Sequence, residues 1–211
     1  MAKNTPKYIV IHTAAHGTPE KNYDTTASQI NDWHNANGWN GIGYHYVVRL
    51  NGAMEKGRPE ESSGAHTVGL NRISIGICFS GHADYHDWTP EQRKAGMELI
   101  RSLMRKYNID ADHVIGHRES GMNGRPGKPV SKTCPGKKID MNMLRSELSN
   151  SQPAIVATDI WGAKLFHAMK DLYAFAEMVH MPETFVKDLH DIRYSARVNE
   201  IINAYKEKNG H

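Results

Sequence analysis

The sequence contains few cysteines and no long apolar segment. Its 211 residues include only two cysteines, Cys78 and Cys134, which excludes the disulfide framework of small secreted domains. No apolar run approaches the roughly 18 residues that a membrane-spanning helix needs, so we expect no stable membrane insertion. The first residues lack the basic segment and long apolar core of a secretory signal peptide, and we therefore expect synthesis in the cytoplasm.

The chain also lacks a strong excess of one charge. Its 26 Lys and Arg residues against 23 Asp and Glu residues give a formal net charge of +3, and the basic residues are scattered, so we expect no nucleic-acid partner. Histidine is abundant instead: there are 13 histidines, compared with 9 tyrosines and 4 phenylalanines. Because histidine is the commonest metal ligand and titrates near neutral pH, this composition favours metal or acid–base chemistry.

The sequence divides near residue 150. Residues 149–154 are small, polar and proline-containing, which is typical of a linker. Residues 1–148 before it predict one domain. Residues 155–211 carry apolar side chains at steps of three and four, interrupted at Pro182, which predicts a C-terminal helical hairpin.

Strands and helices alternate in the first domain. Short β-branched or alternating runs predict strands, and apolar runs that follow capping residues predict helices. The predicted strands cover residues 8–11, 44–50, 53–56, 73–79 and 114–116, and the predicted helices begin after Asp24–Thr26, at Pro90 and after Asp140. This pattern predicts an α/β fold with a central mixed β-sheet flanked by helices.

Two strand ends and one loop carry potential metal ligands. His12 and His117 each follow a predicted strand, and Cys134 lies in the loop after the last one. The ends of neighbouring strands can converge in space, and a catalytic zinc site needs three protein ligands with a fourth position open for water. Spacing alone leaves other combinations of histidine and cysteine open.

Six short motifs narrow the choice because they occur together in a fixed order. They are YIVIHTA (8–14), GYHYV (43–47), GAHTVG (64–69), ISIGICF (73–79), GHRE (116–119) and TCPG (133–136). This set resembles the zinc-dependent N-acetylmuramoyl-L-alanine amidases of the bacteriophage T7 lysozyme type and the peptidoglycan recognition proteins that share their fold. The resemblance covers about residues 6–148 and does not reach the C-terminal extension.

The resemblance implies a Zn²⁺ ion bound by His12, His117 and Cys134, with Tyr44 and Lys132 as catalytic residues. It implies hydrolysis of the amide between N-acetylmuramic acid and the L-alanine of the peptide stem by zinc-activated water. Such a reaction needs a group that stabilises the oxyanion and a group that donates a proton to the leaving amine. The sequence leaves open which of the two catalytic residues performs which task.

One segment departs from the compact phage pattern. Residues 121–128, between His117 and Cys134, have the character of an insertion. The placement of the catalytic lysine at Lys132 is therefore open to an alternative, which is Lys128.

Three further residues receive weaker predictions. His66, in a glycine-flanked loop, is expected from the resemblance to contact substrate. His45 should point to the opposite face of its strand from Tyr44, in a packed role or behind a metal ligand. Glu119 either orients a ligand imidazole or forms a surface salt bridge.

The expected function is that of a peptidoglycan hydrolase, most similar to a phage endolysin made in the host cytoplasm and acting on the cell wall after release. Two alternatives stay open: a non-catalytic peptidoglycan-binding module, which the same fold provides without the cysteine ligand, and a delivered antibacterial amidase toxin. A regulatory protein partner is a further open alternative, for which the sequence identifies no surface.

Overall fold

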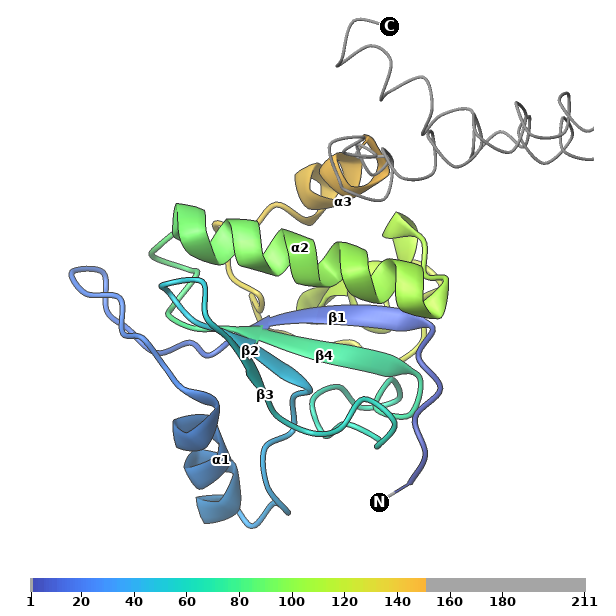
Figure 1. The fold of residues 1–211 in the computed structure, drawn as a ribbon, viewed down its shortest axis with the longest axis horizontal. Helices are drawn as coiled ribbons and strands as arrows, with labels where there is room; N and C mark the ends of the chain where they lie inside the picture. Colours follow the sequence, from blue (N-terminus) through green and yellow to red (C-terminus); the bar gives the residue numbers. More distant parts are fainter. Residues whose placement is uncertain (1, 151–211) are drawn as a thin grey trace, which may run out of the picture. The chain divides into compact units, whose positions relative to one another are not determined.

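A computed structural model describes residues 2–150 of the chain. They form a five-stranded sheet with the strand order β3-β2-β4-β1-β5 (Figure 1). The strands are β1 (Tyr8–Thr13), β2 (Tyr46–Val48), β3 (Met54–Lys56), β4 (Ser74–Phe79) and β5 (Val114–Gly116). Strands β2, β4, β1 and β5 are parallel and β3 is antiparallel to β2, which confirms the predicted mixed sheet.

The helices begin where the sequence places capping residues. They are α1 (Ala27–Ala36), α2 (Pro90–Tyr107) and α3 (Met141–Asn150), with short 3-10 turns η1 (Ala111–His113) and η2 (His117–Glu119). The Thr26 side chain accepts from the backbone of Gln29, whose own side chain accepts from the backbone of Thr26, a reciprocal capping box. The Thr89 side chain caps α2 by accepting from the backbone N–H of Gln92, without the reciprocal bond, and Pro90 stands at the first helical position, where the missing N–H costs nothing.

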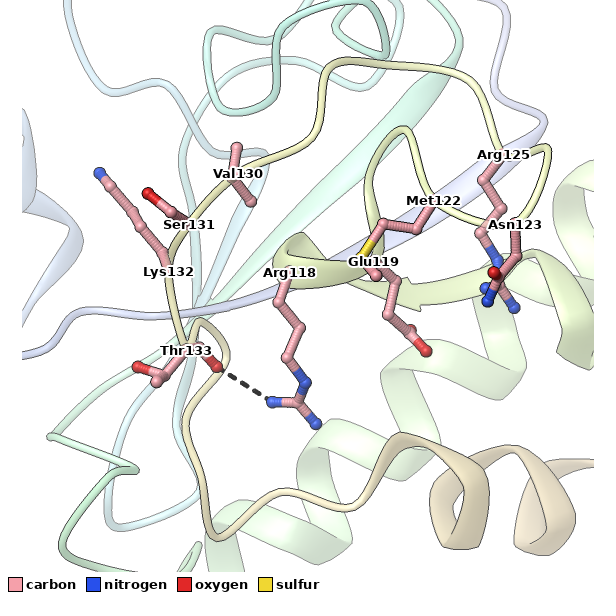
Figure 2. A pocket seen from close by; sticks show the side chains of 9 residues that line it. All are labelled: Arg118, Glu119, Met122, Asn123, Arg125, Val130, Ser131, Lys132 and Thr133. Carbon is pink, nitrogen blue, oxygen red and sulfur yellow. Dashed lines mark hydrogen bonds between the residues drawn. The ribbon is translucent and has the colours of Figure 1, made fainter.

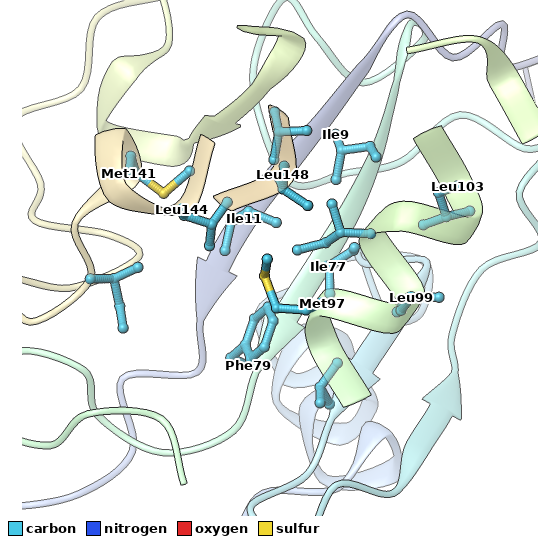
Figure 3. Packing of buried hydrophobic residues seen from close by; sticks show 14 of the residues in the cluster. Ile9, Ile11, Ile77, Phe79, Met97, Leu99, Leu103, Met141, Leu144 and Leu148 are labelled. Atoms are coloured by element: carbon cyan, nitrogen blue, oxygen red, sulfur yellow. The ribbon is translucent and has the colours of Figure 1, made fainter. Parts of the chain in front are cut away.

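The two faces of the sheet are covered by different helices. Helices α2 and α3 lie on one side and α1 lies on the other (Figure 1). Figure 3 shows the core beneath α2 and α3, where the odd-numbered residues of β1 and β4 meet both helices. The members of this core labelled there are Ile9, Ile11, Ile77, Phe79, Met97, Leu99, Leu103, Met141, Leu144 and Leu148.

Side chains alternate between the two faces of the sheet, so the apolar core residues of β1 and the predicted ligand His12 lie on opposite faces. With Ile9 and Ile11 facing α2, their neighbour His12 points to the opposite face, on the side of α1. Burying each large aliphatic side chain contributes about 1.5–3 kcal/mol, so the apolar face holds β1 and β4 in place. The polar side chains on the other face therefore have a rigid support.

Two boundaries differ from the sequence-based ones or lie beyond the described residues. Helix α3 includes Ser149 and Asn150, the first two residues of the predicted linker. The rest of the linker and the predicted helical hairpin, residues 155–211, lie outside the described residues. Within residues 2–150, none of the helices has the length and apolar character to cross a membrane.

Candidate metal centre

The three predicted metal ligands come together at one end of the sheet. His12 is carried by β1, His117 follows β5 directly, and Cys134 lies in the loop before α3. One potential ligand atom of each lies within 4.8 Å of the others. The rings of His12 and His117 have centroids 4.6 Å apart, and Sγ of Cys134 lies 3.7 Å from Nδ1 of His12. In the described part of the chain, no other such group of three or more potential ligands is found.

The donor set and its spacing fit a zinc ion. Zn²⁺ takes imidazole nitrogen at about 2.0–2.1 Å and thiolate sulfur at about 2.3 Å in tetrahedral geometry. Two such ligands of one ion stand about 3.6 Å apart, close to the separation of Cys134 Sγ and His12 Nδ1. Three protein ligands leave a fourth position open, as catalytic zinc requires.

Burial controls the charge of these groups. It lowers the pKa of His12 far below its usual range, and the neighbouring His66 and His117 lower it further. Burial also lowers the pKa of His117 and raises the pKa of the Cys134 thiol to about 11. The imidazoles are thus neutral and offer lone pairs, while a bound cation would favour the Cys134 thiolate.

The predicted metal ligands line an open cleft of about 510 Å³ together with both predicted catalytic residues. The Tyr44 ring lies 5.0 Å from the His12 ring between centroids. Burial raises the pKa of Tyr44 well above its usual value, and the nearby Cys78 and Cys134 raise it further, so its hydroxyl keeps its proton. Lys132 is exposed and lines the same cleft, whereas the alternative Lys128 does not line it.

His66 lies beside the predicted ligand His12 as well as along the cleft. It is only 8% exposed, and its Nδ1 lies 3.0 Å from Nε2 of His12. The sequence predicted contact with substrate for this residue. It gave no local signal for the contact with His12, which is 54 positions away in the chain.

The expectation that Tyr44 and His45 point to opposite faces assumed that both residues lie in one strand. Strand β2 begins only at Tyr46, so strand alternation does not apply to these two residues. The centroids of their rings lie 6.3 Å and 5.7 Å from the centroid of His66. His45 is fully buried; its Nδ1 accepts from the Gly76 N–H, and its Nε2 lies 3.0 Å from the Ser62 carbonyl. Its ring therefore joins backbone segments.

Glu119 supports His117 through the backbone. Its carboxylate accepts from the Gly116 N–H at 2.8 Å and forms two 2.9 Å hydrogen bonds with Arg145. Its side chain and that of Arg145 are 18% and 10% exposed, so this ion pair is mostly buried. No hydrogen bond joins Glu119 to the His117 imidazole among the residues described. Glu119 thus anchors the turn that carries His117.

Two residues that the sequence did not single out hold the cysteine loop. Arg118 donates to the carbonyls of Thr133, Gly136 and Ile139, and Asp84 accepts from the Thr133 hydroxyl and the Lys137 N–H. Both act on backbone or loop groups that are distant in sequence, for which no local motif exists.

A second cavity of about 490 Å³ lies beside the cleft and is lined in part by residues of the segment 121–128. Figure 2 shows its lining, with Arg118 reaching the Thr133 carbonyl and Met122 and Arg125 on the segment 121–128. Residues 131–133 line both cavities. The Lys132 side chain extends away from Arg118 and Met122.

Together, the mixed sheet and the cleft at one end of its strands define an α/β domain whose site is suited to a metal ion. Comparison with known proteins extends this assignment. A family model described as N-acetylmuramoyl-L-alanine amidase matches residues 2–137. The endolysin of Escherichia phage T7 is 34% identical over 115 residues, which are 51% of this chain and 74% of that protein. A peptidoglycan recognition protein of Trichoplusia ni is 32% identical over 150 residues, which are 66% of this chain and 73% of that protein.

A solved structure shows the same fold. The N-acetylmuramoyl-L-alanine amidase LysC from Clostridium intestinale superposes with a TM-score of 0.58 at 30% identity, covering 69% of this chain and 86% of LysC. The chain belongs to the N-acetylmuramoyl-L-alanine amidase family. It is a peptidoglycan hydrolase, which confirms the resemblance found in the six motifs and the predicted enzyme class.

Proposed function

We propose that the protein is a zinc-dependent phage endolysin that reaches the cell wall after release from the host cytoplasm. The observation that carries this proposal is the gathering of His12, His117 and Cys134 in one cleft with Tyr44 and Lys132. The names of the relatives support it, since the T7 protein is an endolysin and LysC is an amidase. The scissile bond is the amide between N-acetylmuramic acid and L-alanine.

His12, His117 and Cys134 would hold the zinc ion in this proposal. When bound, such an ion lowers the pKa of a water molecule towards about 7 and polarises the substrate carbonyl. Two neutral imidazoles and one thiolate would leave the zinc site with a net positive charge, which favours the deprotonated form of the bound water.

Tyr44 and Lys132 would act on the substrate itself. The Tyr44 hydroxyl retains its proton in its buried position, so it can donate a hydrogen bond to the carbonyl oxygen or a proton to the leaving nitrogen. The Lys132 ammonium group stands at the open side of the cleft and can stabilise the negative charge that develops on the carbonyl oxygen.

A zinc measurement combined with a muropeptide digest tests this function. The intact protein should bind one equivalent of zinc and release free stem peptides from purified peptidoglycan. Cys134→Ala should lose both properties, whereas Cys78→Ala, at the second and fully buried cysteine, should keep its zinc. A protein that binds cell walls without zinc and without releasing peptides would show a binding module instead.

A further inference from the structure

The two ring nitrogens of His12 face different groups. Nδ1 lies 3.7 Å from the Cys134 sulfur, on the side of the metal centre. Nε2 lies 3.0 Å from Nδ1 of His66. A metal-bound histidine usually donates its second N–H to a carboxylate or a carbonyl. The oxygen atoms of these groups accept a hydrogen bond without any choice of tautomer. Here the outer partner is another imidazole, which can accept only in one of its two neutral tautomers.

The direction of each hydrogen bond follows from the metal outward. A metal ion at His12 Nδ1 needs the lone pair of that nitrogen, so the ring proton stays on Nε2 and is donated to His66 Nδ1. His66 then carries its own proton on Nε2, which lies 3.4 Å from Oγ of Ser74. The Ser74 hydroxyl donates at 2.8 Å to the carbonyl of Leu70, and a carbonyl only accepts.

We propose that His66 is a positioning residue for the metal ligand His12, and that His12, His66 and Ser74 form a donor chain that ends at the Leu70 carbonyl. This proposal rests on the proposed zinc function. This donor chain keeps the Nδ1 lone pair of His12 directed towards the metal centre before any ion binds. All three of its side chains are buried, so water does not offer competing partners.

Two glycines hold the His66 ring in this orientation. A Cβ atom added at Gly64 would lie 2.4 Å from Cδ2 of His66, and one added at Gly76 would lie 2.6 Å from it. Any larger residue at either position would displace the ring. The Thr67 hydroxyl lies 3.1 Å from His66 Nδ1 and 3.4 Å from His12 Nε2. Because the single lone pair of His66 Nδ1 is engaged by His12, the hydroxyl oxygen can accept a second, longer contact from the same His12 N–H.

Nitrogen NMR of the histidine rings tests the chain directly in the intact zinc-loaded protein. We expect His12 to bind zinc through Nδ1, and both His12 and His66 to carry their proton on Nε2. A His66 ring protonated on Nδ1 in a zinc-loaded protein would overturn the donor chain while leaving the zinc function in place. A protein that binds no zinc at all would overturn both.

Zinc affinity, measured by competition with a chromophoric chelator, provides a second test. His66→Leu should weaken zinc binding by about 10–100-fold, the usual cost of losing an outer partner. His66→Asn should recover much of this loss, because the amide oxygen can accept near the position of Nδ1. Gly76→Ala should weaken binding by displacing the ring. Equal affinity in His66→Leu and the wild type would contradict the proposal, as would equally weak binding by the Leu and Asn variants.

Ser74→Ala removes the hydroxyl that accepts from His66 Nε2, and a matched control variant exists for this change. Ser120 is also fully buried, and its hydroxyl has no hydrogen-bond partner among the described residues, so Ser120→Ala makes the same change outside the donor chain. We expect weaker zinc binding in Ser74→Ala and unchanged binding in Ser120→Ala. Equal zinc affinity in the two variants would overturn the role of Ser74.

Discussion

The sulfur of Cys134 lies 3.7 Å from Nδ1 of His12, although 122 positions separate the two residues in the chain. Only the folded protein assembles this pair, so a metal ion that binds there stabilises the folded state. Zinc at about 1,000 times its dissociation constant should raise the free energy of unfolding by about 4 kcal/mol. Calorimetry with and without a chelator measures the increment, which Cys134→Ala should abolish. Equal unfolding midpoints with and without zinc would contradict a metal role for this pair.

Replacement of Tyr44 by phenylalanine removes only its hydroxyl. Because burial keeps that hydroxyl protonated, we expect it to act as a donor, and Tyr44→Phe should lower kcat by about 100-fold or more. Zinc content and KM should change little. Release of stem peptides under saturating substrate provides the measurement, and a variant with the wild-type kcat would exclude Tyr44 from the reaction.

The two lysines of the cysteine loop can be separated by matched substitutions. Lys132 lines the cleft of the metal ligands and Lys128 does not. Lys132→Met should therefore lower kcat/KM by about 100-fold, the usual effect of losing one group that stabilises developing negative charge. Lys128→Met should leave kcat/KM unchanged. The opposite ranking of the two variants would place the catalytic lysine at position 128.

The lowered pKa of Asp24 makes the free energy of unfolding depend on pH in the acid range. Hydrogen bonds from Arg49 lower the pKa of Asp24 from 3.8 to about 2 against the opposing effect of burial. A carboxyl with a lowered pKa adds stability that is fully present above its unfolded value and is lost as the pH falls from 3.8 through 2. The shift corresponds to at most about 2 kcal/mol, since the side chain is partly exposed.

Urea unfolding at a series of pH values checks this prediction. Asp24→Asn should be less stable than the wild type at pH 7 by no more than about 2 kcal/mol, and the difference should shrink below pH 4. Asp32→Asn, at an exposed position on α1, serves as the control and should follow the wild type. A constant difference between Asp24→Asn and the wild type across this pH range would contradict the assignment.

Local signals in the sequence predicted most of the fold. Capping residues such as Thr26 and Thr89 mark helix starts because their side chains satisfy backbone N–H groups a few residues away. The β-branched run of residues 8–11 marks a buried strand for a similarly local reason, and the structure extends that strand to Thr13. Strand β2 was predicted too long because only Tyr46–Val48 pair with both neighbouring strands, and pairing depends on residues that are distant in sequence.

The motif order of the sequence alone predicted the ligand set, a catalytic tyrosine and lysine, and the family, of which the family is confirmed. These residues could be named in advance because each lies in a short pattern whose type matches its chemistry. The tertiary structure alone decided how the groups behind them act. His66 meets His12 and Ser74, and Glu119 meets Arg145, across loops and strands that fold together. These hydrogen bonds require the partner atoms to lie about 3 Å apart in space. Neither the positions of these residues in the sequence nor their types predict which of them come that close.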